Sequence, residues 1–134
     1  MFISETKIRV RYAETDQMGF VYYGNYPQYY EVGRTEALRS LGTSYKDLEE
    51  FGVMMPVIDM NVKYLKSGRY DDLLTIKTFV VEVPETRMKF KYEIFNEAGE
   101  LLNVGETTLI FLSKERNRPV RCPEWMQNLF KPFF

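Results

Sequence analysis

The chain contains no histidine and only one cysteine, and both scarcities limit its possible chemistry. Without histidine, neither a Ser-His-Asp triad nor a Cys-His pair can form within the chain, and a histidine-based zinc site is excluded. The single Cys122 can build neither an internal disulfide nor a thiolate metal site, which favours a reducing, cytoplasmic setting. In an enzyme, proton transfer would therefore fall to Asp, Glu, Lys or Tyr. We expect neither a metal nor another cofactor.

Further absences argue against nucleic acid and membranes as partners. Eighteen basic residues oppose nineteen acidic ones, so the net charge of −1 provides no general positive field for nucleic acid. No apolar run approaches the roughly 20 residues that are needed to span a bilayer. The first six residues, MFISET, have neither the basic region nor the apolar segment of a signal peptide. We expect a protein that does not bind nucleic acid and does not span a membrane.

The chain does contain enough apolar surface for one folded domain over residues 1–134. Hydrophobic residues make up 45% of it and aromatic residues 16%, and such aromatics favour a pleated sheet. Alternation of apolar and polar residues, or apolar runs between turns, predicts strands. Five stretches fit these patterns: 3–12, about 54–66, 73–83, 87–96 and 101–113. We expect the last four to run as a meander.

One long helix is predicted over residues 26–41. Asn25 fits the N-cap position, Pro27 fits the first turn, and Gly42 ends the helix. Ser44 predicts a short capped helix over 44–51. The face of the long helix that we expect to be buried holds Tyr26, Tyr29, Tyr30, Gly33, Ala37 and Leu41. One helix against a five-stranded, mostly antiparallel sheet is an α+β architecture, with the helix in the concave face of a curved sheet.

Asp16 has the clearest potential for catalysis. It is followed closely by the apolar and aromatic residues 20–23, and burying an acid in such surroundings is unfavourable unless it finds donors. The predicted helix start near Asn25 supplies free N–H groups and a positive dipole end close by. Asp16 could therefore act as nucleophile or general base on a carbonyl that those N–H groups polarise. On local sequence alone, the alternative is that Asp16 merely caps a turn.

Other charged residues are also candidates for a functional role. Glu31 and Arg34 have the i, i+3 spacing of a surface ion pair on the helix. Asp59 either faces a cavity or lies at an edge or bulge of a strand. Basic residues gather in three clusters: Lys63, Lys66 and Arg69; Arg87, Lys89 and Lys91; and Lys114, Arg116, Arg118 and Arg121. These clusters form either solvated faces or, where strands bring them together, a site for a phosphate-bearing ligand.

Residues 11–26, RYAETDQMGFVYYGNY, resemble the active-site signature of the hotdog-fold acyl-CoA thioesterases. The nearest group is the 4-hydroxybenzoyl-CoA thioesterase family with its Tol-Pal-associated branch. Its pattern is Asp-x-x-Gly-x-Val-Tyr/Trp, then Tyr or His, then Asn/Ser-Tyr and a helix with an acidic residue followed by Arg, here within residues 30–36. Residues 62–73 also resemble the family, with Ser67 in place of its usual proline. The likeness covers about residues 5–120.

The resemblance implies a hotdog fold, a long central helix wrapped by a curved five-stranded antiparallel sheet. It implies hydrolysis of acyl-CoA at sites between the subunits of a homodimer, with two dimers forming a tetramer. Asp16 matches the catalytic carboxylate, a nucleophile or general base, and Tyr23 matches the residue whose backbone N–H polarises the thioester carbonyl. Gly19 permits the tight turn near the substrate. Further residues expected at the substrate are Val21, Tyr22, Tyr26 and Asp59, with Arg69, Arg87 and Lys89 expected at the phosphates of coenzyme A.

Two alternatives to an acyl-CoA thioesterase stay open. One is a thioesterase of the same fold that acts on acyl carrier protein, and the other is a non-catalytic acyl-binding or scaffold protein. A hotdog hydratase is disfavoured, since the hydratases that we would compare use an Asp-His pair. The identity of the acyl group is open as well.

Overall fold

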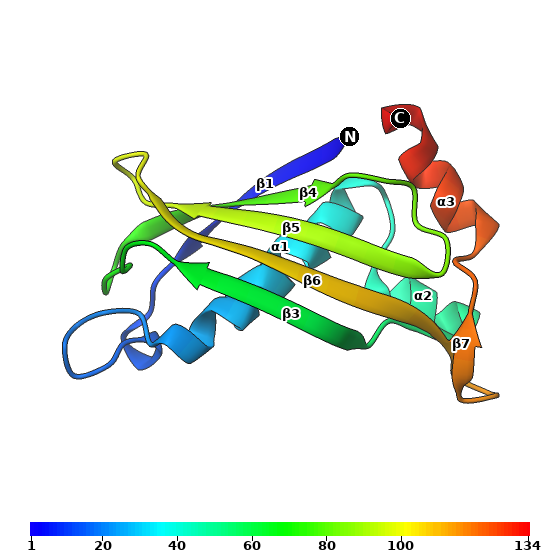
Figure 1. The fold of residues 1–134 in the computed structure, drawn as a ribbon, viewed down its shortest axis with the longest axis horizontal. Helices are drawn as coiled ribbons and strands as arrows, with labels where there is room; N and C mark the ends of the chain where they lie inside the picture. Colours follow the sequence, from blue (N-terminus) through cyan, green and yellow to red (C-terminus); the bar gives the residue numbers. More distant parts are fainter.

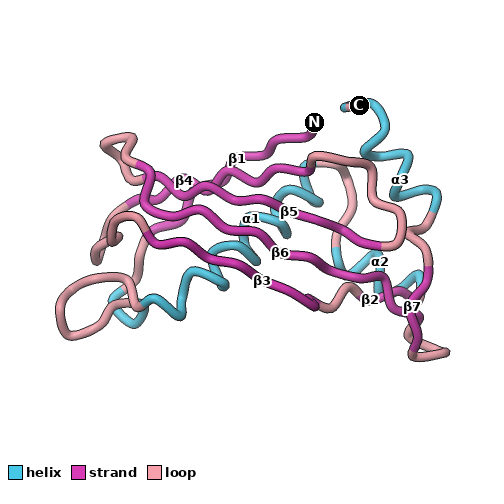
Figure 2. Tube along the Cα trace, in the orientation of Figure 1, coloured by secondary structure: helices cyan, strands magenta, loops and turns pink.

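The computed structural model describes residues 1–134 and shows one long helix against one face of a curved antiparallel sheet (Figure 1). The long helix α1 spans Tyr26–Ser40, in agreement with the prediction. The five long strands are β1 (Phe2–Arg9), β3 (Val57–Tyr64), β4 (Leu73–Val80), β5 (Arg87–Phe95) and β6 (Leu101–Ser113). Two short strands, β2 (Val53–Met54) and β7 (Arg118–Val120), and two short helices, α2 (Tyr45–Phe51) and α3 (Glu124–Phe130), complete the fold. Figure 2 shows α1 behind the sheet and no helix over its opposite face.

The order of the strands corrects one prediction. Strands β4, β5 and β6 form a meander, but β3 pairs with β6 and not with β4. The long strands therefore run in the order β1-β4-β5-β6-β3. The reason lies in β1, which pairs with β4 along its whole length, from Phe2 opposite Val80 to Arg9 opposite Leu73. Because that side of β4 is occupied, β3 joins the sheet at the opposite edge.

The predicted strand 54–66 is broken at Met55 and Pro56, so that β2 and β3 are separate. Proline has no N–H to donate to a neighbouring strand, which explains the break. Strand β3 pairs with β6 on one side only, and its second edge is free. Its large apolar side chains are correspondingly exposed, each by 44–48%: Val57, Ile58, Met60 and Tyr64.

The core lies between α1 and the concave face of the sheet. Helix α1 buries its tyrosines, Gly33 and Ala37 as predicted, but Leu38 is buried in place of Leu41, which is the C-cap. Two close approaches explain glycines in this layer. A side chain at Gly105 would collide with the ring of Tyr30, and one at Gly33 would lie 2.7 Å from the hydroxyl oxygen of Thr78. The helix therefore packs directly on the sheet.

The longest helix, α1, has 15 residues. None of the helices is both long enough and apolar enough to cross a membrane.

Candidate active site

The segment between β1 and α1 is held in place by Glu14, which is only 5% exposed. Its carboxylate accepts hydrogen bonds from the backbone N–H of Arg11 (2.8 Å), from the guanidinium of Arg11 (3.1 and 3.3 Å) and from the hydroxyl of Tyr29 (3.1 Å). Its backbone carbonyl accepts from the N–H of Tyr22 (2.9 Å) and the side-chain amide of Asn25 (2.8 Å). Glu14 thus joins the end of β1, both limbs of the loop and α1.

Asp16 lies two residues further on, in the tight turn that this framework supports. One carboxylate oxygen, Oδ1, accepts hydrogen bonds from the N–H groups of Met18 (2.9 Å) and Phe20 (3.2 Å). Gly19 closes the turn with φ +79°, a conformation that disfavours residues with a Cβ. The second oxygen, Oδ2, has no hydrogen bond within the chain and is free to act on a ligand. Asp16 therefore caps its own turn and still presents a free oxygen, so the two readings of the sequence are compatible.

The start of the long helix faces the same space. A 3-10 turn, Tyr23–Asn25, leads directly into α1. The N–H of Tyr23, the first residue of this turn, donates to no backbone carbonyl of the loop. Asn25 occupies the N-cap position, as predicted, but its side chain makes no capping hydrogen bond and donates to Glu14 instead. The first turn of the helix thus keeps free donors and the positive end of its dipole.

A cavity of about 290 Å³ brings these groups together. Its lining includes four of the residues predicted from sequence, Asp16, Val21, Tyr23 and Tyr26. Of the other lining residues, Lys66 belongs to one of the basic clusters noted in the sequence and Ser67 stands at the family's usual proline. Sequence reasoning did not single out Met18, Phe20, Tyr64 and Leu65. Residues 64–67 follow β3, and the resemblance of residues 62–73 to the family was the available signal for them.

Tyrosine hydroxyls frame this cavity. Tyr64 donates to the backbone carbonyl of Tyr23 (2.9 Å), and the hydroxyl of Tyr26 accepts from the N–H of Gly68 (3.2 Å). Burial raises the pKa of Tyr26, and it also raises the pKa of Tyr64. Both hydroxyls are therefore protonated at neutral pH. Asp16 is the one carboxylate among the residues that line the cavity.

The remaining predicted residues divide into two groups. Tyr22 packs on the ring of Tyr23 (centroids 4.6 Å apart), and the Arg69 guanidinium lies 4.9 Å from the ring centroid of Phe20. Both are therefore close to the Asp16 loop. Neither they nor Gly19 line the cavity itself, and the same holds for Asp59, Arg87 and Lys89.

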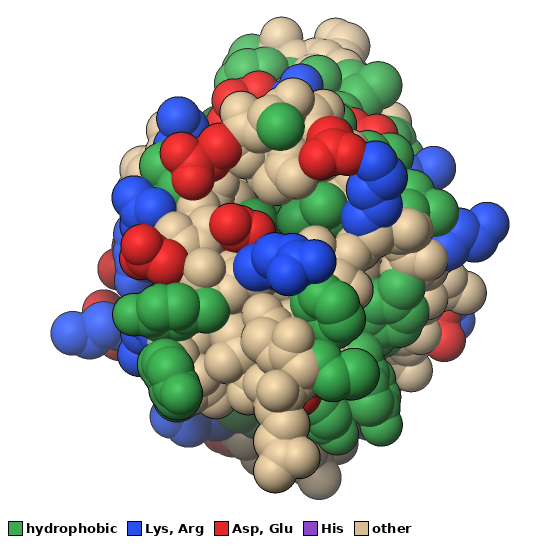
Figure 3. All heavy atoms as spheres, turned by 90° about the vertical axis from the view of Figure 1, so that its left-hand side faces the viewer, with side chains coloured by type: hydrophobic (Ala, Val, Ile, Leu, Met, Phe, Trp, Pro, Cys, Tyr) green, Lys and Arg blue, Asp and Glu red, His purple; other side chains and the backbone are tan.

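These three residues lie elsewhere on the sheet. Asp59 follows a register shift on the edge strand β3, as one of the two readings of the sequence expected. Arg87 and Lys89 are at the start of β5, opposite Ile110 and Thr108 of β6, whereas the cavity adjoins the other end of β6 near Leu102. The basic clusters therefore do not converge within one chain, and on the end of the molecule shown in Figure 3 acidic and basic side chains are intermixed.

The predicted surface ion pair between Glu31 and Arg34 is not formed. Arg34, in the middle of α1, lies instead beside the side chains of Tyr45 and Tyr92. The reason is that Arg34 occupies the helix face that turns towards the sheet, four residues after the buried Tyr30.

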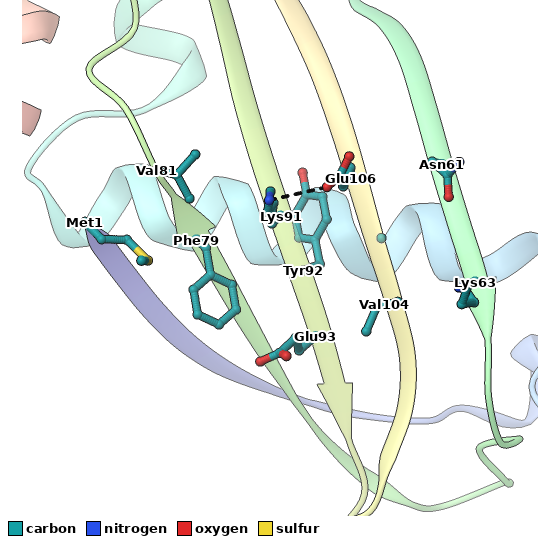
Figure 4. A pocket seen from close by; sticks show the side chains of 11 residues that line it. Met1, Asn61, Lys63, Phe79, Val81, Lys91, Tyr92, Glu93, Val104 and Glu106 are labelled. Atoms are coloured by element: carbon teal, nitrogen blue, oxygen red, sulfur yellow. Dashed lines mark ion pairs between the residues drawn. The ribbon is translucent and has the colours of Figure 1, made fainter.

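A larger hollow, about 570 Å³, lies on the opposite face of the sheet (Figure 4). Apolar side chains such as Phe79 and Val104 line it together with charged ones, and Lys91 is paired with Glu106 at 3.6 Å. None of the residues from the Asp16 loop borders it. It offers no helix terminus, and so we take the smaller Asp16 cavity as the candidate active site. No group of three or more Asp, Glu and Cys side chains is arranged to hold a metal, and the expectation of no cofactor stays a prediction.

Comparison with known proteins identifies the family of the chain. Residues 18–103 match the family model described as "Thioesterase superfamily". The chain is 39% identical over 129 residues to the "Putative acyl-CoA thioesterase YneP" of Bacillus subtilis, covering 93% of this chain and 94% of that protein. It is 33% identical over 124 residues to the "Acyl-CoA thioester hydrolase YbgC" of Escherichia coli, covering 92% of each chain.

The fold is also similar to that of a solved structure. The "DHNA-CoA Thioesterase from Staphylococcus aureus" superposes with a TM-score of 0.92 at 42% identity, covering 99% of this chain and 91% of that one. The shared family extends over most of the chain and includes most of the lining of the Asp16 cavity. The chain belongs to the thioesterase superfamily and has its hotdog fold.

Proposed function

We propose that this thioesterase hydrolyses an acyl-CoA to a free carboxylate and coenzyme A at the Asp16 cavity. The observation that carries the proposal is geometric. Asp16 is the one carboxylate lining a cavity that also holds Tyr23, whose N–H is free at the entry to α1. Names of relatives at 33–39% identity, given as acyl-CoA thioesterase or thioester hydrolase, support the same substrate class.

The reaction that we propose uses the free oxygen of Asp16. Oδ2 either attacks the thioester carbon or takes a proton from the attacking water, and the carbonyl oxygen becomes an oxyanion. The Tyr23 N–H and the positive end of α1 stabilise that oxyanion, an effect typically of about 3 kcal/mol for one such donor. The C–S bond then breaks and the thiolate of coenzyme A takes up a proton. Where water attacked, the acid is released directly; where Oδ2 attacked, water cleaves the mixed anhydride formed on Asp16, which releases the acid and regenerates the carboxylate.

We further propose that the working unit is a homodimer paired through β3, with two dimers able to form a tetramer. The free edge of β3 supports this pairing, because an unpaired strand edge with exposed apolar side chains is normally covered. A second copy of β3 can supply the missing hydrogen-bond partners and bury the exposed Val57, Ile58 and Met60. The single cysteine favours the cytoplasm as the compartment.

For the substrate, we propose an aromatic acyl group joined to coenzyme A. The cavity contains three tyrosines, Tyr23, Tyr26 and Tyr64, whose rings suit stacking or edge contacts with an aromatic ring. The Staphylococcus aureus structure at 42% identity carries the name of an enzyme for the aromatic DHNA-CoA. Arg69, beside the Asp16 loop, is placed to meet a phosphate of coenzyme A, while Arg87 and Lys89 can do so only from another position on the assembly.

The test is the variant Asp16→Asn in a thiol-release assay with benzoyl-CoA. We expect kcat to fall about a hundredfold or more, since a lost base or nucleophile has effects of that size. Asp47→Asn is the matched control, because Asp47 is exposed on α2 and should leave kcat unchanged. Near-normal turnover by Asp16→Asn would refute the proposal. Faster turnover of the same acyl group on acyl carrier protein would instead show that the substrate is the carrier-protein ester and not the coenzyme A ester.

A further inference from the structure

The backbone carbonyl of Tyr23 accepts a hydrogen bond that the proposed reaction leaves without a role. Its donor is the hydroxyl of Tyr64, the last residue of β3, at a distance of 2.9 Å. In a regular α-helix the N–H four residues later would donate to this carbonyl, but residue 27 is a proline and has no N–H. A side chain from the sheet therefore supplies a donor that the helix cannot.

Tyr64 reaches this carbonyl from a rigid support. Its backbone lies opposite Asn103 of β6, at the end of the β3 ladder. Its ring lies edge-on to the ring of Tyr26, with centroids 5.6 Å apart, and edge-on to the ring of Tyr23, at 6.4 Å. These contacts hold the ring between the sheet and the entry to α1, so the position of its hydroxyl is set by both.

Few other groups hold the backbone of Tyr23. Its neighbours Tyr22 and Asn25 are tied to the loop through the backbone carbonyl of Glu14, at 2.9 and 2.8 Å. The backbone of Tyr23 makes no hydrogen bond to that loop, and its side chain is 64% exposed. Tyr64 is thus the side chain that ties the backbone of Tyr23 to the sheet.

The hold on this backbone matters because the proposed oxyanion donor is the N–H of the same residue. Donors of this kind act only when they are fixed in advance at the place where negative charge develops. A displacement of about 1 Å in a group that takes part in a reaction can cost about a hundredfold in rate. Restraint of the Tyr23 carbonyl therefore also restrains the group on which oxyanion stabilisation depends.

From these contacts we propose that Tyr64 is a positioning residue, whose hydroxyl holds the Tyr23 N–H where the oxyanion forms. The inference rests on the proposed function, since it deepens the account of the oxyanion donor in that reaction. The ring of Tyr64 lines the cavity and can contact an acyl group, whereas its hydroxyl is bonded to the protein. Removing the hydroxyl alone therefore separates positioning from contact with the substrate.

The first experiment compares Tyr64→Phe with the native enzyme in thiol release from benzoyl-CoA. Phenylalanine keeps the ring beside Tyr23 and Tyr26, so we expect kcat to fall about tenfold to a hundredfold while KM changes by about twofold at most. Tyr70→Phe is the matched control, because Tyr70 is 52% exposed, packs edge-on to Tyr12 and does not line the cavity. A kcat of Tyr64→Phe within twofold of the native value overturns the proposal.

The second experiment observes the thioester carbonyl directly. Benzoyl-CoA labelled with ¹³C at this carbonyl is bound to Asp16→Asn, which should turn over slowly, and to the double variant Asp16→Asn with Tyr64→Phe. A positioned donor polarises the carbonyl, so we expect binding to move the ¹³C resonance downfield in Asp16→Asn and clearly less in the double variant. If Tyr64 only stabilised the fold, Tm would fall while the resonance moved equally in both complexes, which contradicts the proposal.

A rescue experiment tests the hydrogen bond itself. Pro27→Ala gives residue 27 an N–H that can donate to the Tyr23 carbonyl in place of the lost hydroxyl. We expect Pro27→Ala to raise the kcat of Tyr64→Phe and to change the kcat of the native enzyme little.

The association state is measured as well, because Tyr64 ends the free edge of β3. Since its hydroxyl is bonded within its own chain, Tyr64→Phe should keep the native state in analytical ultracentrifugation. Dissociation that accompanies the loss of kcat would assign the hydroxyl to the interface between subunits and overturn the proposal.

These results separate the inference from the proposed function. Normal turnover in Asp16→Asn would remove the catalytic proposal itself. Strongly reduced turnover in Asp16→Asn together with a native kcat in Tyr64→Phe would remove only the role of Tyr64.

Discussion

Removing the carboxylate of Glu14 should damage both stability and turnover, although Glu14 does not line the Asp16 cavity. The variant Glu14→Ala removes the acceptor of four hydrogen bonds. Two of their donors lose their only partner, the hydroxyl of Tyr29 at a buried position and the backbone N–H of Arg11 at a partly buried one, at about 1–2 kcal/mol each. The Arg11 side chain is 76% exposed, so its ion pair adds only up to about 1 kcal/mol.

These contributions give a loss of about 3 kcal/mol in the free energy of unfolding, which lowers Tm by about 12 °C in a domain of this size. Glu14→Gln should lose only about 1 kcal/mol, because its amide oxygen can still accept from Arg11 N–H and Tyr29 while its NH₂ group faces the exposed guanidinium. Because Glu14 also fixes the loop that carries Asp16 and Tyr23, we expect kcat to fall about tenfold or more in Glu14→Ala, with KM changed less.

The assays are thermal unfolding and steady-state thiol release at a temperature at which each variant is folded. Glu36→Gln is the control, since Glu36 forms an exposed pair with Arg39 and should change Tm by only a degree or two. Equal effects of Glu14→Ala and Glu14→Gln, or a kcat of Glu14→Ala within twofold of the native value, would show that the hydrogen bonds of Glu14 do not set the geometry of the site.

Two further predictions concern other parts of the fold. Met60→Lys places a charge in the middle of the free β3 edge and should give a monomer without thioesterase activity, measured by analytical ultracentrifugation and thiol release; Ile3→Lys on the opposite edge strand β1 is the control. A fully active Met60→Lys monomer would contradict the site between subunits. Burial raises the pKa of Cys122 to about 12, so the thiolate forms only far above neutral pH, and a thiol reagent at pH 7–8 should label the protein only after unfolding. Rapid labelling of the folded protein would show that Cys122 is accessible.

The parts of the fold that were predicted well depend on local signals. Helix α1 ends within one residue of its predicted end, since Gly42 takes φ +87° directly after the last turn. Ser44 caps α2 by accepting from the N–H of Asp47 (3.1 Å), and Gly52 ends that helix with φ +99°. Such signals act over three or four residues, so they can be read along the chain.

The order of the strands could not be read in this way. Nothing within β3 shows that it pairs with β6 rather than with β4, because the outcome depends on β1, about 50 residues earlier in the chain, occupying β4 first. The exposed row on β3 is a consequence of that competition between distant segments. The edge that we propose for dimerisation is therefore a property of the assembled sheet.

The site shows the same division between local and distant causes. Asp16 and Tyr23 were identified from one short motif, and the turn around Asp16 is made by its own neighbours. Glu14 was missed as the support of the loop, although its spacing from Arg11 is that of a capping box. Its importance comes from burial beside Tyr29 of α1, which the spacing alone does not indicate.

By itself, the sequence determined the long helix and most of the long strands, the absence of histidine chemistry and the carboxylate on which the proposed reaction depends. Tertiary structure decided which groups surround that carboxylate. It brought Tyr64 and the residues after β3 to the Asp16 loop, turned Arg34 away from Glu31 towards Tyr45, and left one edge of β3 free. The physical reason is that helix caps and turns are set by neighbouring residues, whereas burial and strand pairing are set by competition among segments far apart in the chain.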